Sequence, residues 1–79
     1  MDEKSLKHYI REISCLLKDY ARQAKVDADN PEKGNSDYNT GYLMAYHEVL
    51  ATMKNQAPFF DLTQEELNLA DIEPERDLV

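Results

Sequence analysis

The chain contains few of the residues that cross-link small proteins or bend their backbone. Its 79 residues include one cysteine, Cys15, two glycines and three prolines. A single cysteine excludes an internal disulfide framework, and a lone thiol fits the reducing cytoplasm better than a secreted scaffold. With only Gly34 and Gly41, the sequence also has no glycine-rich loop of the kind that cradles phosphates.

Long apolar runs are missing as well. No stretch approaches the roughly 18 apolar residues of a membrane-spanning helix, and the N-terminus opens on Asp2 and Glu3 instead of a basic segment followed by an apolar one. Nine Lys and Arg stand against sixteen Asp and Glu, which gives a net charge of −7. Nucleic acid and anionic lipid repel an acidic chain. We therefore expect a cytoplasmic protein that binds neither nucleic acid nor membrane.

What the chain does have is helical periodicity. Apolar side chains recur every three to four residues over two segments that are separated by a run of turn-forming residues. We predict a helix over 3–26, a loop over 27–36 and a second helix over 37–57, which ends because Pro58 disfavours helical geometry in the preceding residue. The two helices should form an antiparallel hairpin.

The first residues of the second helix predict its N-cap and include a glycine. Ser36 or Asp37 is the expected N-cap, since short polar side chains accept hydrogen bonds from free backbone amides. Gly41 costs about 1 kcal/mol within a helix relative to alanine. Either another helix or a ring approaches it closely, or it lies in a frayed first turn.

The remaining residues carry a helix-start signal and an acidic end. Residues 63–66 (TQEE) match the capping box and predict a short helix over 64–70. Residues 71–79 alternate acidic and apolar side chains. They form either an extended tail or a strap that docks through Ile72 and Leu78.

A hairpin of this size is expected to need a partner surface. Chains of fewer than about 80 residues often complete their core by oligomerising, and the apolar arc of the second helix spans roughly 160–180°, more than one partner helix requires. We predict a single all-α domain: an antiparallel hairpin, a short C-terminal helix and an acidic tail, which completes a four-helix bundle as a homodimer. The predicted dimer interface consists of Tyr38, Tyr42, Ala45, Tyr46, Val49 and Met53.

Basic side chains gather on one flank of the first helix. They are either a solvated face with local acidic partners or a docking surface for something acidic. Residues 61–79 carry one arginine against seven acidic residues, so this segment is the nearest acidic candidate. We expect it to lie near the flank, within one subunit or between two. The flank contains Lys4, Lys7, Arg11, Lys18, Arg22 and Lys25.

Two rows of side chains contain residue types that can bind ligands. A structural zinc site usually gathers pairs of ligands from two segments, whereas the four metal-ligating residue types on the first helix form one strip, which favours a polar face. A tyrosine at every fourth position of the second helix could hold a planar ligand or a peptide, although such stripes are more often core or interface. The strip is His8, Glu12, Cys15 and Asp19, and the row is Tyr38, Tyr42 and Tyr46.

No nucleophile has both a base and an orienting third group. Cys15 has Arg11, Lys18 and His8 within a turn or two along its helix, cationic neighbours of the kind that favour a thiolate, but no residue supplies the orienting third group. We therefore expect a protein-interaction module, an adaptor or regulator without catalytic activity or cofactor, whose acidic tail engages a basic protein. One alternative is an acidic inhibitor or immunity-type protein that blocks a basic nucleic-acid-acting enzyme. Another is a metal or small-ligand binder.

Overall fold

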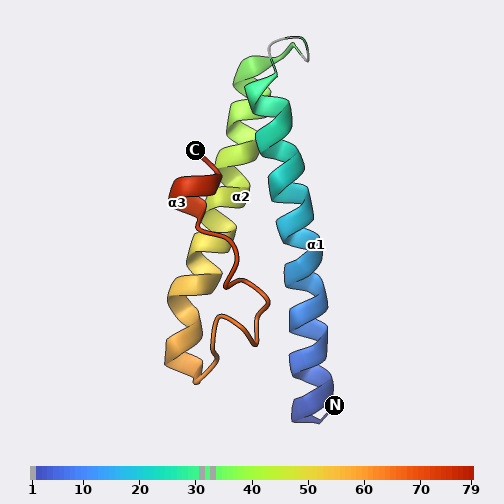
Figure 1. Ribbon diagram of the computed structural model, residues 1–79, viewed down its shortest axis with the longest axis vertical. Coiled ribbons are helices and arrows are strands. Elements are labelled where there is room, and N and C mark those ends of the chain that lie inside the picture. Colours follow the sequence, from blue (N-terminus) through green and yellow to red (C-terminus); the bar gives the residue numbers. More distant parts are fainter. Residues whose placement is uncertain (1, 31, 33) are drawn as a thin grey trace.

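The computed structural model describes residues 2–30, 32 and 34–79. Within them the fold is all-helical, as predicted, with α1 (Glu3–Asp29), α2 (Ser36–Gln56) and the short α3 (Pro74–Asp77). The two long helices run antiparallel as a hairpin, close together at the loop end and further apart at the other end (Figure 1). Among these residues, neither long helix has an apolar stretch that could span a bilayer.

α1 begins where the sequence indicates and ends three residues later than predicted. The Asp2 carboxylate accepts a hydrogen bond from the Ser5 amide at 2.7 Å and so caps the first turn. At the other end, Lys25 pairs with Asp29 one turn on, which supports the extra turn. The helix stops at Asp29, and Asn30 is its C-cap.

The start of α2 differs from both predictions. Its N-cap is Asn35, which adopts left-handed geometry with a φ of 47°, and neither Ser36 nor Asp37 has that role. Asparagine tolerates this geometry better than most residues. Gly41 lies in the second turn, and a Cβ built there would meet nothing within 4 Å, so close approach of another group does not explain it.

After Gln56 the chain tightens into a 3₁₀ turn, η2 (Ala57–Phe60), that contains Pro58. The predicted capping box then forms, since the Thr63 hydroxyl accepts from the Glu66 amide and Glu66 accepts from the Thr63 amide, each at 3.0 Å. The helix that was predicted over 64–70 does not form. Residues 64–68 form a single hydrogen-bonded turn that ends at Asn68, whose φ is 59°.

Burial explains why this turn does not continue as a helix. Leu67 and Leu69 are both buried, yet on a helix residues two apart point about 160° away from each other. Only a chain that leaves helical geometry can direct both side chains into one core. The local capping signal is therefore outweighed by the packing of the leucines.

The C-terminal residues dock on the hairpin. We refer to residues 61–79 as the strap. Its Ile72 and Leu78 are fully buried, which selects the docked strap over the extended tail. The strap supplies four of the nine buried apolar residues among those described, and α1 and α2 supply most of the others. These core residues are Ala21, Ala24, Leu43, Leu50, Ala57, Leu67, Leu69, Ile72 and Leu78.

Candidate functional site

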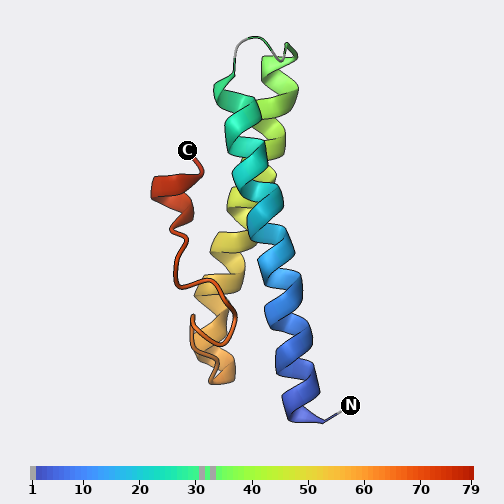
Figure 2. The same cartoon turned by 45° about the vertical axis from the view of Figure 1, so that its right-hand side comes forward.

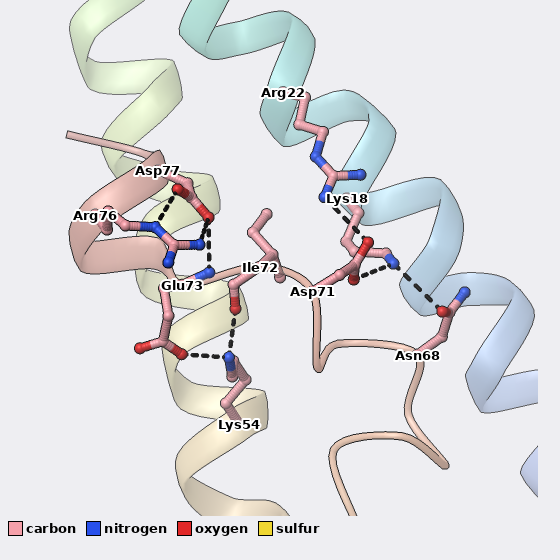
Figure 3. A network of polar contacts seen from close by, with 9 residues as sticks. All are labelled: Lys18, Arg22, Lys54, Asn68, Asp71, Ile72, Glu73, Arg76 and Asp77. Carbon is pink, nitrogen blue, oxygen red and sulfur yellow. Dashed lines mark hydrogen bonds and ion pairs between the residues drawn. The ribbon is translucent and has the colours of Figure 1, made fainter.

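The strap is held to the hairpin by ion pairs from both long helices (Figure 3). On α1, Lys18 donates to Asp71 at 2.7 Å and Arg22 donates to the same carboxylate at 3.2 Å. Lys7 pairs with Glu66 of the strap at 2.8 Å. The acidic segment thus lies against the basic flank within one chain, as expected.

Asp71 is the centre of these contacts. Lys18 is only 4% exposed, although its ammonium reaches Asp71, whose side chain is 59% exposed. The Lys18 ammonium, together with Arg22, lowers the pKa of the Asp71 carboxyl to about 2. Lys7 and the Thr63 amide lower the pKa of Glu66 to about 2 in the same way. Both carboxylates therefore stay ionised at any physiological pH.

A second set of contacts ties the strap to α2. Lys54 donates to the Ile72 carbonyl and pairs with Glu73 at 2.5 Å. Asp77 accepts from the Glu73 amide and from Arg76, and Arg76 holds the pKa of Asp77 below its ordinary range. The acidic end of the chain is therefore engaged internally, so these carboxylates do not form a free acidic tail.

Among the described residues, no other segment covers the opposite side of the hairpin (Figure 2), although Leu6 at one end also borders Phe60, Asp61 and Leu62. α1 presents there a row of exposed apolar residues in steps of three and four, and α2 presents a matching row. We name these two rows together the uncovered face. Its α1 row is Leu6, Tyr9, Ile13, Leu16 and Tyr20, and its α2 row is Tyr38, Tyr42, Ala45 and Val49.

The predicted interface lies only partly on this face. Tyr38, Tyr42, Ala45 and Val49 are exposed there, whereas Tyr46 and Met53 are half-buried and pack against the core. The residues of the α1 row were not part of the predicted interface. A signal was present: the neighbouring row contains Ser14, Ala21 and Ala24, small side chains that allow close approach of another segment.

A cluster of tyrosine rings lies at the loop end of the uncovered face. The ring centroids of Tyr42 and Tyr46 are 5.2 Å apart, and those of Tyr20 and Tyr46 are 6.4 Å apart, so the cluster joins both helices. The Tyr42 hydroxyl, 3.5 Å from that of Tyr46, raises the pKa of Tyr46. Beside the cluster is an open cavity of about 260 Å³, the tyrosine pocket, lined by Tyr20, Gln23, Ala24, Asp27, Tyr38, Asn39 and Tyr42.

Acidic side chains border the uncovered face. Glu12 and Asp19 lie about 40–60° beyond the outermost residue of the α1 row, and Glu48 lies about 60° beyond Ala45 on α2. Asp27 borders the tyrosine pocket. We name these four the acidic rim. Within the described part of the chain, the lysines and arginines of both long helices lie on the strap side by helical position. Five of them contact strap groups there: Lys7, Lys18, Arg22, Lys25 and Lys54.

The candidate metal strip is not assembled into a site. His8 and Glu12 approach to 4.0 Å, and Cys15 is half-buried on the same helix. Among the described residues, no three of His, Cys, Asp and Glu come together as a metal ion requires.

No protein-family model, curated protein or solved structure matches this chain.

Proposed function

We propose that the chain is a small cytoplasmic protein-interaction module without catalytic activity, and that it binds a basic amphipathic helix of another protein on the uncovered face. The observation that carries the proposal is the separation of charge across the hairpin. Apolar and aromatic side chains on this face are bordered by Glu12, Asp19, Asp27 and Glu48. The basic flank lies on the other side, against the strap.

The dimensions of the face suit a helix. From Leu6 to Tyr20 the α1 row extends about 21 Å, the length of roughly four helical turns. Tyrosines are enriched among the residues that dominate binding energy at interfaces, and Tyr9, Tyr20 and Tyr38 are all more than half exposed. A partner that places apolar residues on the two rows and Arg or Lys against the acidic rim would match both properties.

A second copy of the chain is the other candidate occupant. The three-four spacing on both helices favours it, because two such hairpins can complete a four-helix bundle. The acidic rim opposes it, since a second copy brings the same carboxylates to the contact.

Binding of designed peptides tests the proposal. The probe is an amphipathic helical peptide with leucines at three-four spacing and arginines on both flanks, and its control carries glutamates in place of the arginines. We expect a one-to-one complex by sedimentation equilibrium, with the arginine peptide bound at least about tenfold more tightly than the glutamate peptide. If the protein alone sediments at twice the chain mass and binds neither peptide, the face belongs to a second copy.

Matched variants locate the binding surface. Leu16→Asp should leave the fold intact, because Leu16 is 47% exposed, and should weaken peptide binding by at least about tenfold. Thr40→Asp, an exposed position of α2 outside the uncovered face, should leave it unchanged. Equal losses in the two variants would place the binding surface elsewhere.

A further inference from the structure

We infer that an apolar groove at the open end of the hairpin, opposite the loop, binds one aromatic side chain carried near an end of the partner helix. The inference rests on the proposed function, because the aromatic residue would belong to that partner. It adds a preference for one kind of side chain at a defined place beside the uncovered face. We name this site the end groove. Its apolar lining consists of Leu6, Ile10, Phe60 and Leu62.

The groove exists because the two long helices diverge toward this end (Figure 1). Leu6 and Ala24 are 18 residues apart, about five helical turns, so they point to the same side of α1. Ala24 is buried against the core, whereas Leu6 is half-exposed. Opposite Leu6 lie Phe60 of η2 and Leu62 of the strap, and an open cavity of about 600 Å³ remains between these segments and α1. The core is therefore incomplete at this end.

The ring of Phe60 favours an aromatic occupant. Phe60 is 69% exposed although it lines the groove. It is carried on an ordered turn, because Pro58 restricts the backbone and the Leu62 amide donates to the Ala57 carbonyl at 3.1 Å. Aromatic rings attract one another in offset or edge-to-face arrangements, beyond the gain from apolar burial alone. A ring that enters the groove can make such a contact with Phe60, and an aliphatic side chain cannot.

Position and charge match the groove to the proposed basic partner. Leu6 belongs both to the groove and to the α1 row, so a helix on the uncovered face reaches the groove without a break. Glu3 and Asp61 add two carboxylates to the lining, and its one lysine, Lys7, is already paired with Glu66 at 2.8 Å and with Glu3 at 3.4 Å. Basic residues next to the aromatic one would find opposite charge here, whereas a second copy of the chain would bring the same carboxylates.

Tryptophan in the designed peptide tests the groove. The protein contains no tryptophan, so the fluorescence of a peptide tryptophan reports only on its own surroundings. The probes are two arginine-flanked peptides, each with a tryptophan one turn beyond the leucines, at one end or at the other. Their controls carry alanine at the same position. We expect tryptophan at one of the two ends to raise the affinity at least about fivefold over alanine and to emit at shorter wavelength when bound.

The two neighbouring phenylalanines provide matched variants. Phe60 lines the groove, whereas Phe59 does not and is 79% exposed. Phe60→Ala should reduce the affinity ratio of the tryptophan and alanine peptides to less than about twofold, and Phe59→Ala should retain the wild-type ratio. Both rings are mostly exposed, so the variants should keep the helical circular dichroism of the wild type. An equal ratio in wild type and Phe60→Ala, for both pairs of peptides, would overturn the inference.

The two proposals fail in different ways. If the alanine peptides bind and tryptophan raises the affinity at neither end, the uncovered face binds a helix and the inference about the groove is wrong. Titration of the full chain with N-acetyl-tryptophanamide probes the groove without a helix. If this compound gives saturable NMR shifts of the Leu6, Ile10 and Leu62 methyl groups and no peptide binds, the groove stands and the helix-binding function is wrong.

The remaining outcomes contradict the inference. If neither the peptides nor N-acetyl-tryptophanamide binds, both proposals are wrong. If the protein alone is a dimer and Phe60→Ala converts it to a monomer, the groove belongs to the contact between two copies.

Discussion

Lys18 is the residue on which attachment of the strap to α1 depends most. Its side chain is buried, and its ammonium bonds to Asp71 at 2.7 Å and to the Asn68 side chain at 3.4 Å. Removing one partner of a buried pair costs about 3–5 kcal/mol, and removing one partner of an exposed pair costs about 0–1 kcal/mol. Because Asp71 is 59% exposed, the pair lies between these limits.

Asp71→Asn should lower the free energy of unfolding by about 1–2 kcal/mol at pH 7. The carboxyl has a pKa of about 2 in the folded chain, below its ordinary 3.8. Its contribution is therefore complete above about pH 4 and is lost as the pH falls toward 2. The difference in unfolding free energy between wild type and variant, measured by denaturant titration, should become smaller as the pH falls over this range. If wild type and variant differ in unfolding free energy by the same amount at pH 7 and pH 2, the charge of Asp71 is not the source of the difference.

At the scale of elements, the strap belongs to the core of the protein. Ile72 and Leu78 have no exposed surface, and α3 between them is a single turn with Pro74 at its start. Ile72→Ala should therefore cost about 2–5 kcal/mol of unfolding free energy, through lost burial and the cavity left behind.

The measurement is urea denaturation followed by helical circular dichroism. Val79→Ala is the control, because Val79 is 61% exposed and should change the unfolding free energy by less than about 0.5 kcal/mol. If Ile72→Ala unfolds with the wild-type midpoint, the strap does not contribute to the core.

Local signals in the sequence predicted some elements and not others. The hairpin was predictable because apolar spacing and Pro58 act within a few residues of the positions they affect. The helix over 64–70 was predicted wrongly because burial of Leu67 and Leu69 depends on a surface formed by distant parts of the chain. Periodicity also could not decide which of the two apolar rows of α1 would be covered, since both have helical spacing.

At the scale of the whole molecule, the hairpin has two different sides. One is covered by the strap and held by ion pairs, and the other is apolar with an acidic border. The uneven charge along the sequence indicated that the C-terminal acids would find the basic flank. It did not indicate that this pairing would leave the carboxylates of the acidic rim around the remaining apolar surface.

Salt dependence should distinguish the two occupants of the uncovered face. Raising ionic strength from about 0.05 M to about 0.5 M screens the acidic rim, so the Kd of the arginine-flanked peptide should rise by about three- to tenfold. Association of two copies should strengthen under the same change, because repulsion between their rims weakens. A peptide Kd that stays constant or falls with salt would contradict the assignment to a basic partner.

The distance along the chain between the strap and its anchors also sets an order of folding. Asp71 meets Lys18 and Arg22 across 53 and 49 positions, whereas α1 and α2 are joined by a short loop. Contacts between distant residues require closure of a large loop and are generally made late, after local ones. The hairpin should therefore assemble first and the strap should dock last. In native-state hydrogen exchange, the amides of 61–79 should accordingly open before those of the paired helices.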